Sequence, residues 1–164
     1  MPDTVVPPIS QKYSELISTQ VKQISELLNI SPMIPQIKVR NYEGAFDFET
    51  IVEFNSPRLR IACGRLNQFP GNCGMVVINN LMVTDSYRGK GVGKILVKIL
   101  EDIAAIGGYT IALATTNQGC VAANHIFEKH ANYQKIDTLA FTNARTQSKI
   151  TTWIKNIREE KSKK

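Results

Sequence analysis

The residues of this chain whose types and spacing favour ligand chemistry lie between positions 81 and 93, in the run Leu-Met-Val-Thr-Asp-Ser-Tyr-Arg-Gly-Lys-Gly-Val-Gly. Its three glycines alternate with other residues, at Gly89, Gly91 and Gly93. Glycine adopts backbone dihedrals that other residues avoid and lets a ligand approach the main chain closely. If a helix begins near Val92, the unpaired amides of its first turn and the helix dipole form an anion site. With Arg88 and Lys90 alongside, the segment predicts a pyrophosphate site.

Other glycine-rich motifs fit this segment less well. The spacing differs from the dinucleotide fingerprint G-x-G-x-x-G, and no acidic residue follows at the end of the next predicted strand. The G-K-[ST] of a nucleoside-triphosphate loop is absent from the sequence. A tight turn with solvated basic residues is the plainer interpretation of a lone G-x-G, but it does not account for the whole thirteen-residue pattern.

The segment resembles the central motif of the GNAT family of N-acetyltransferases, roughly L-x-V-x-P-x-[YF]-[RQ]-G-x-G-[IV]-G followed by an amphipathic helix. The matching residues are Leu81, Val83, Tyr87, Arg88, Gly89, Gly91, Val92 and Gly93. Asp85 stands where the family often has proline. The resemblance implies acetyl-coenzyme A as cosubstrate, without a metal, and direct transfer to an amine. It also implies that the amides of Arg88, Gly89, Lys90, Gly91, Val92 and Gly93 hold the coenzyme pyrophosphate. The backbone of Met82 and Val83 would pair with the pantetheine and polarise the thioester carbonyl.

A second family segment, N-x-x-A-x-x-[FL]-Y-[EK]-[KR]-x-G-F, carries a tyrosine that serves as general acid toward the leaving thiolate. This chain has Cys-Val-Ala-Ala-Asn-His-Ile-Phe-Glu-Lys-His-Ala-Asn-Tyr over 120–133. Aligning Asn132 and Tyr133 with the terminal G-F puts Glu128 at the tyrosine position. Aligning Phe127 with the tyrosine requires one inserted residue. Neither register supplies a tyrosine.

The missing tyrosine slows acyl transfer without forbidding it. A coenzyme A thiol should have a pKa near the cysteine value of ~8.5, so its thiolate is a tolerable leaving group, and a general acid contributes roughly 10²–10⁴-fold. The amine needs more help, because an alkylammonium with a pKa of ~10.4 must first lose a proton. Candidate bases are Glu49 and Glu53, on strands that face the central run, with Glu128 as a further catalytic candidate. Arg145, in a polar turn, is a candidate contact for an anionic acceptor.

The remaining reactive side chains show no metal pattern. His125 and His130 are five residues apart, too far round a helix for the usual ligand pair. Cys120 is a candidate nucleophile for a two-step route, although packing is the simpler role. The three cysteines are scattered and odd in number, which favours a reducing compartment and a cytoplasmic protein. No stretch is apolar over the length of a membrane span, and the first residues lack the plan of a signal peptide.

The elements that must position these residues follow from the hydrophobic pattern. Helices are predicted from Ser10 to about Asn29, from Val92 to Ile106 and from Val121 to His130. Strands are predicted at 37–40, 45–54, 59–63, 75–83, 110–114, 133–136 and 139–141, with a loop over 64–74. The segment 150–157 fits a strand or a helix equally. This order predicts a mixed α/β domain whose central, mostly antiparallel sheet is flanked by helices.

The length and the net charge of the chain indicate its domain organisation and the kind of ligand it binds. The 164 residues suit one domain over 10–157, with an irregular arm at 1–9 and a basic tail at 158–164. The net charge of +6 and pI of about 9.3 favour an anionic ligand. A competing hypothesis is a module of the same fold that binds acyl-coenzyme A or nucleic acid without catalysis, although no nucleic-acid motif is present. A homodimer is compatible with the sequence, which leaves both the oligomeric state and the acceptor open.

Overall fold

The computed structural model describes residues 9–30, 33–41, 48–68, 74–117, 120–136 and 150–158, which form helices packed on a seven-stranded sheet. The helical segments are α1 (Ile9–Leu28), the 3-10 turn η1 (Asp85–Tyr87), α2 (Val92–Ile106), α3 (Val121–His125) and the π-helix η2 (Ile126–His130). The strands are β1 (Ile34–Asn41), β2 (Phe48–Asn55), β3 (Arg60–Gln68), β4 (Met75–Val83), β5 (Ile111–Asn117), β6 (Gln134–Ile136) and β7 (Ile150–Asn156).

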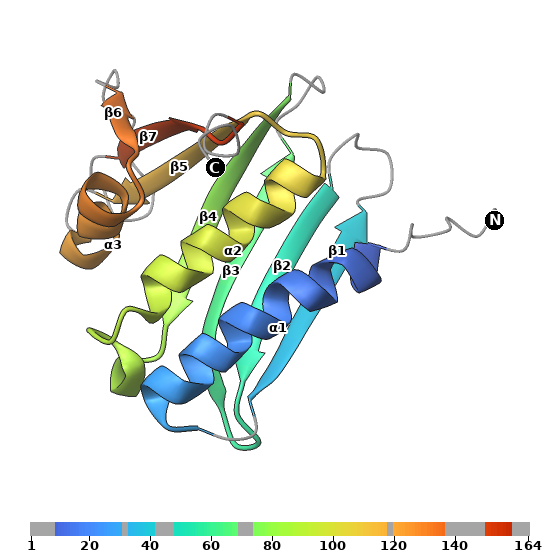
Figure 1. The fold of residues 1–164 in the computed structure, drawn as a ribbon. Coiled ribbons are helices and arrows are strands. Elements are labelled where there is room, and N and C mark those ends of the chain that lie inside the picture. The colour runs from blue at the N-terminus through green and yellow to red at the C-terminus, as the bar shows by residue number, and fades with distance from the viewer. Residues whose placement is uncertain are drawn as a thin grey trace.

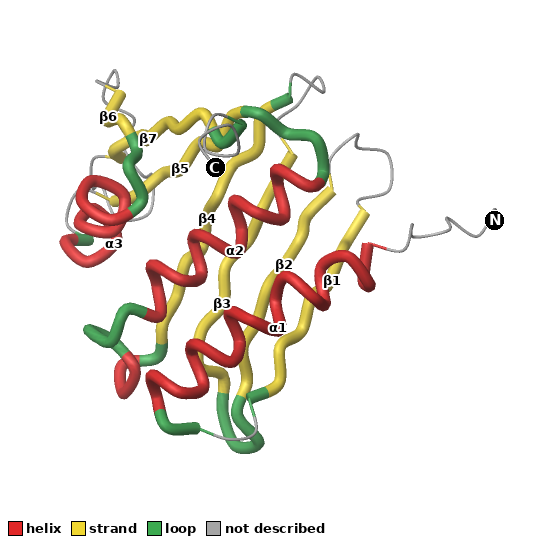
Figure 2. Tube along the Cα trace, viewed as in Figure 1, coloured by secondary structure: helices red, strands yellow, loops and turns green. Residues whose placement is uncertain are grey.

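The sheet has the order β1-β2-β3-β4-β5-β7-β6 and is antiparallel except between β4 and β5. A parallel neighbour requires a crossover connection, and α2 supplies it. Helices α1 and α2 lie side by side across one face of β1–β4, while α3 lies beside β5–β7 (Figure 1; Figure 2). The predicted mixed α/β fold is confirmed.

The core lies between α1, α2 and the sheet face beneath them. Helix α2 buries one stripe because its apolar residues recur every three or four positions. The buried members of that stripe are Val92, Leu96, Val97, Ile99, Leu100, Ile103 and Ala104. Each large aliphatic side chain removed from water contributes roughly 1.5–3 kcal/mol. From α1, Ile17 and Ile24 enter the same core, whereas Leu27 near the end of the helix is 51% exposed.

A β-bulge in β4 changes which side chains face the helices. Ile78 is in the core and pairs with Leu66, and Val83, five residues on, packs against the same core and pairs with Ala62. The β3 partners are only four residues apart, so β4 contains one extra residue. Asn80 has a left-handed φ of 51° at this point, which identifies it as the bulged residue.

Strands β4 and β5 diverge at the bulge. Their pairing runs from Met75 with Ile111 to Ile78 with Ala114. Beyond it β5 continues with β7, whereas β4 continues with β3 (Figure 1). The edge of β4 that faces away from β3 therefore has no β5 partner from Asn79 onward.

Long-range pairing overrides the sequence prediction in two segments. The predicted loop over 64–74 was wrong in its first part, because residues 64–68 continue β3 and pair with β4. The ambiguous segment at 150–157 is strand β7, held between β5 and β6. The strand predicted at 139–141 lies outside the described residues. In the part of the chain described here, no helix is both long and apolar enough to cross a membrane.

Candidate functional site

The predicted pyrophosphate turn connects the end of β4 to α2. It begins with η1, in which Tyr87 N donates to Thr84 O (2.8 Å) and Arg88 N donates to Asp85 O (3.2 Å). Gly89 and Gly91 follow with left-handed φ values of 73° and 82°, which residues with a Cβ rarely adopt. An added Cβ would meet nothing within 4 Å at Gly89. Backbone conformation, and not crowding, requires glycine there.

The start of α2 directs unpaired amides outward from this turn. The first helical hydrogen bond runs from Ile95 N to Gly91 O (3.3 Å), so the amides of residues 92–94 have no acceptor within the helix. Because α2 has 15 residues, its aligned peptide dipoles add partial positive charge at this end. This geometry suits a phosphate group.

The side chain of Arg88 stabilises the turn. Its Nε donates to Val83 O (3.0 Å), and its Nη1 lies 3.0 Å from Asp85 Oδ1. Asp85, which stands where the resemblance expects proline, thus contacts Arg88 through an exposed ion pair. Lys90 is exposed, with its Nζ 5.9 Å from the centre of the Tyr87 ring.

Gly93, unlike Gly89 and Gly91, has no left-handed backbone, and its surroundings are what favour glycine. It lies inside α2, and an added Cβ would stand 2.8 Å from Ile126 Cδ1 of η2. Glycine at this position therefore allows α2 and η2 to approach each other closely.

Backbone direction distinguishes the two residues predicted to contact pantetheine. Thr84 N donates to Ile61 O of β3 (2.9 Å), whereas Val83 O accepts from Arg88 on the other side. Since successive residues of a strand alternate in direction, the main chain of Met82 turns toward β3. The backbone of Leu81 and Val83 turns toward the side from which β5 has diverged.

A cavity of about 290 Å³ occupies the divergence of the two strands. Its lining residues come from β4, β5, β7, α3 and η2, and from Cys120 just before α3: Ile78, Asn79, Asn80, Leu81, Thr115, Thr116, Cys120, Ala123, Phe127 and Ile150. Thr116 is on the helix-covered face of β5, and its neighbour Thr115 is on the opposite face. The cavity is thus lined from both faces of the sheet.

The π-helix η2 accommodates one extra residue next to this cavity. Its wider turn closes with a hydrogen bond from Ala131 N to Ile126 O (2.9 Å), five residues apart. The register that places Phe127 at the family's tyrosine position requires one insertion, and the π-turn is where that insertion fits. Phe127 is 1% exposed and lines the cavity. It packs edge-to-face against Tyr133 (4.9 Å between ring centres).

Of the predicted acid–base residues, Glu128 and Glu53 are not among the residues that line the cavity. Glu128 is exposed and 3.9 Å from Lys129. Glu53, which is 7% exposed, forms an ion pair with Arg60 (Nη2–Oε1 3.0 Å), and its strand position places it on the face opposite the helices. Glu49 is paired in register with Asn67, and its side chain is outside the described part. Arg145 also lies outside the described residues.

Sequence reasoning missed a buried polar network behind the cavity. Trp153 Nε1 donates to Thr116 Oγ1 (2.9 Å), and the Thr116 hydroxyl donates to Asn124 Oδ1. This network joins β7, β5 and α3. Threonines in a strand pattern give no sequence signal for such a role, because it depends on residues 37 positions apart. Asn80, the bulged residue of β4, and its neighbour Asn79 both line the cavity.

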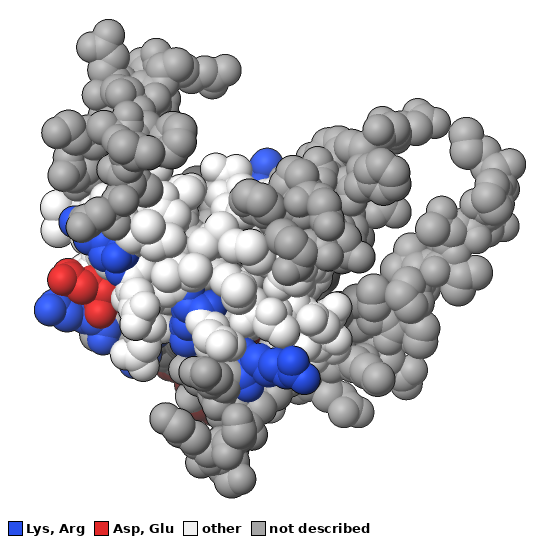
Figure 3. All heavy atoms as spheres, turned by 90° about the horizontal axis from the view of Figure 1, so that it is seen from above, with Lys and Arg blue, Asp and Glu red and all other residues white. Residues whose placement is uncertain are grey.

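The basic side chains and the possible metal ligands are the last features of the surface and the site. Lys and Arg side chains form separate groups on the face seen in Figure 3, and they do not merge into one continuous basic patch there. Among the described residues, no group of three or more histidine, cysteine or acidic side chains is arranged to hold a metal ion.

Comparison with known proteins gives a class to this fold and site. The model of the acetyltransferase (GNAT) family matches residues 37–133, more than half of the chain. The chain therefore belongs to the GNAT family and is an acyltransferase. No curated protein sequence matches it significantly.

Solved structures share the fold at low sequence identity. An N-acetyltransferase from Staphylococcus aureus is 19% identical, with a TM-score of 0.58 over 66% of this chain and 68% of that one. Spermidine N-acetyltransferase from Vibrio cholerae, in complex with CoA and spermine, is 14% identical (TM-score 0.56; 67% and 66%). The ribosomal-protein-S18-alanine N-acetyltransferase from Escherichia coli is 13% identical (TM-score 0.53; 71% and 72%).

Proposed function

We propose that this protein transfers an acetyl group from acetyl-coenzyme A to a primary amine by direct attack on the thioester. The observation that carries the proposal is the divergence of β4 from β5, which opens a cavity lined from both faces of the sheet. The donor and the acceptor can then approach one carbonyl carbon from different sides. Strand β4, which lines this cavity, leads through the turn at residues 84–91 to the start of α2 and its unpaired amides.

In the proposed complex, the pyrophosphate occupies the turn at residues 88–93. Amides of the first turn of α2 donate to its oxygens, with Lys90 nearby. The pantetheine runs along the unpaired edge of β4, where the backbone of Leu81 and Val83 is directed. A main-chain amide beside the thioester polarises its carbonyl and stabilises the negative charge that develops there.

The reaction forms one bond and breaks one. The neutral amine nitrogen attacks the thioester carbon and forms the C–N bond, and the C–S bond breaks as coenzyme A leaves as its thiolate. The nitrogen gives up its extra proton to water. Phe127 carries no proton to donate, so we propose that water protonates the thiolate. The cost is bounded by the roughly 10²–10⁴-fold that a general acid supplies.

For the general base we propose candidate residues, and for the acceptor we propose a chemical class. Glu53 and Glu49 remain the candidates for removing the ammonium proton, with water as the link. Glu128 remains a catalytic candidate only through the register that places it at the family's tyrosine position. We infer an amine acceptor because the related structures include enzymes for spermidine and for an alanine of ribosomal protein S18. Arg145 remains a candidate contact if that acceptor is anionic.

Calorimetry and thiol release test this proposal together. Purified protein is titrated with acetyl-coenzyme A and then assayed for free thiol with polyamines, amino-acid amides and peptide N-termini as acceptors. We expect binding and amine-dependent thiol release. Absence of binding would sink the proposal, and binding without turnover on any amine would favour a non-catalytic acyl-coenzyme A module.

The role of Glu53 is tested by comparing Glu53→Gln with Glu128→Gln. If Glu53 is the base, the first variant loses roughly 10²–10⁴-fold in kcat at neutral pH, and the second keeps its rate. Equal, small effects would remove Glu53 from the mechanism.

A further inference from the structure

The two walls of the cavity belong to different parts of the molecule. Ile78 and Leu81 are on β4, which packs directly beneath α2. Thr116 and Phe127 are on β5 and η2. Because β4 and β5 stop pairing at Ile78 and Ala114, contacts away from the cavity must set the separation of its walls.

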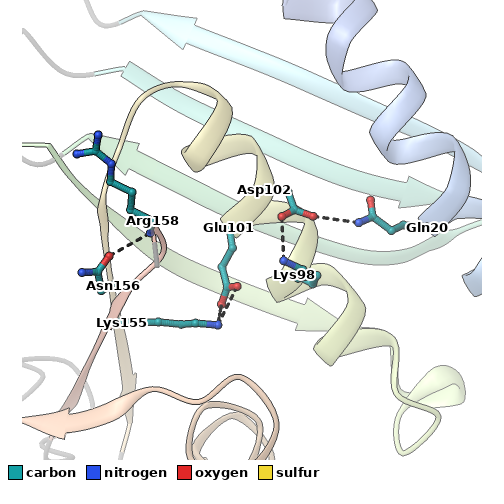
Figure 4. Close-up of polar contacts among 7 residues, drawn as sticks. All are labelled: Gln20, Lys98, Glu101, Asp102, Lys155, Asn156 and Arg158. Carbon is teal, nitrogen blue, oxygen red and sulfur yellow. Dashed lines mark hydrogen bonds and ion pairs between the residues drawn. The ribbon is translucent and has the colours of Figure 1, made fainter. Parts of the chain in front are cut away.

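A buried ion pair makes such a contact between α2 and β7. Lys155 Nζ lies 3.1 Å and 3.3 Å from the two carboxylate oxygens of Glu101. The side chains are 9% and 4% exposed, respectively. Figure 4 shows the two side chains pointing toward each other across the space between the helix and the strand.

The same lysine connects to the cavity wall through two aromatic rings. Its Nζ lies 5.7 Å from the centre of the Tyr133 ring, and that ring packs edge-to-face on Phe127 at an interplanar angle of 78°. Tyr133 is 5% exposed, so the path runs through packed interior. Helix α2 is thereby connected to Phe127 through a series of contacts, from Glu101 to Lys155, then to Tyr133 and on to Phe127.

A buried ion pair of this kind does more to set the relative position of α2 and β7 than to stabilise the folded protein. Removing two charges from water costs about as much as their mutual attraction returns, so apolar residues of similar volume often replace a buried pair without loss of stability. Apolar side chains, however, slide past one another more easily. A buried charge that loses its partner is strongly destabilising, so Glu101 and Lys155 must stay within contact distance of each other.

We propose that Glu101 and Lys155 are positioning residues that hold Phe127 in place through Tyr133 and so set the width of the acyl site. This inference rests on the proposed function, because it requires an acyl group to occupy the cavity. A site of fixed width favours acetyl over longer acyl chains. Loss of the pair lets the Phe127 wall move and relaxes that preference.

The experiment compares Glu101→Met/Lys155→Met with wild type and with Lys98→Met. Lys98 is on the same helix and pairs with Asp102 at 2.9 Å, but it is 53% exposed and lies away from β7 (Figure 4). Its variant is a control for the loss of an exposed ion pair on α2. Two readouts are used: the ratio of kcat/KM for acetyl-coenzyme A to that for butyryl-coenzyme A, and acrylamide quenching of tryptophan fluorescence.

Trp153 makes the second readout specific and independent of activity. It is the single tryptophan of the chain and stacks 6.3 Å from Phe127. Increased access of acrylamide to Trp153 therefore reports loosening of this wall directly.

We expect the double variant to unfold cooperatively, to show at least twofold stronger quenching, and to lose about tenfold of its preference for acetyl. Lys98→Met should match wild type in both. A folded double variant with the wild-type ratio and quenching would overturn the inference. If the double variant does not fold, the charge-swapped Glu101→Lys/Lys155→Glu protein decides by the same two readouts. If wild type transfers no acyl group, the proposed function fails, while unchanged quenching still refutes the positioning role separately.

Discussion

At the residue scale, glycine has two different roles in the turn that the sequence first indicated. Gly89 and Gly91 are required by their left-handed backbone, whereas a Cβ at Gly93 would press on the end of the Ile126 side chain. Sequence spacing alone treats the three as equivalent. Only the packing of η2 against α2 separates them.

A substitution at Gly91 tests the anion site. Gly91→Glu places a side chain and a negative charge beside amides that would face phosphate, so the Kd for acetyl-coenzyme A should rise more than about 100-fold, or roughly 2.7 kcal/mol. Calorimetry measures this change. Gly108→Glu is the matched control, because Gly108 also has a left-handed φ (88°) and open space at its Cβ, but it follows the far end of α2.

Both variants should lose a similar 1–2 kcal/mol of stability, roughly the strain of a left-handed non-glycine residue, and only Gly91→Glu should lose binding. A folded Gly91→Glu protein with the wild-type Kd would show that the coenzyme binds elsewhere.

The cysteines should differ in reactivity for a physical reason. Burial raises the pKa of the Cys63 thiol above its ordinary value, an effect that Arg60 and Arg65 offset only in part. Because the folded pKa is raised, the stability that Cys63 contributes is present below about pH 9 and lost as the pH rises through the folded pKa. Cys120 is exposed and lines the cavity.

Iodoacetamide at pH 8 to 9 should therefore label Cys120 well before Cys63, as mapped by peptide mass spectrometry. Acetyl-coenzyme A should slow the labelling of Cys120 and leave Cys63 unaffected. Faster labelling of Cys63 would contradict the burial argument.

At the element scale, the bulge in β4 is the feature that shapes the cavity. A single extra residue, Asn80, lets Leu81 and Val83 pack toward the helices, as Ile78 does. It does so where β5 diverges from β4, so β4 is irregular at the point where it lines the cavity. Asparagine tolerates the left-handed conformation better than most residues with a side chain.

Replacement of the bulge residue tests this role. Asn80→Val puts a β-branched residue at a φ of 51° and should cost about 1–2 kcal/mol of stability, together with about tenfold in affinity for acetyl-coenzyme A. Asn132→Val carries a similar strain at a φ of 56°, outside the cavity. It should lower stability alone. Denaturant unfolding and calorimetry separate the two, and equal binding losses would argue against a special role for the bulge.

At the scale of the whole molecule, the proposed coenzyme contacts span the start of α2, the edge of β4 and the cavity wall. A ligand that bridges these parts should stabilise the native state by mass action. At a concentration of 100 times Kd, acetyl-coenzyme A should add about 2.7 kcal/mol. For a domain of this size that corresponds to a rise in Tm of roughly 5–10 °C.

The shift in Tm should shrink with added salt, because the ligand is anionic and the protein carries a net charge of +6. Differential scanning fluorimetry at low and high ionic strength measures it. A shift of full size in Gly91→Glu would contradict the proposed binding mode.

The sequence by itself determined the features that depend on neighbouring residues. Strand β4 and helix α2 have the predicted bounds, Met75–Val83 and Val92–Ile106, because a continuous apolar run and a helical stripe are local patterns. The glycine-rich turn between them is local as well, and with it the family resemblance. The division into arm, domain and tail stays a prediction.

Tertiary structure decided what depends on distant partners. Residues 64–68 are strand because β4 lies beside them, and 150–156 are strand because β5 and β6 flank them. The π-turn of η2, which no local pattern reveals, is where the insertion needed to align Phe127 would fit, and the choice between Phe127 and Glu128 stays a prediction. The cavity joins residues from β4 to β7, and its walls are connected by a pair 54 positions apart. Such contacts form only when the chain closes on itself, so sequence periodicity cannot encode them.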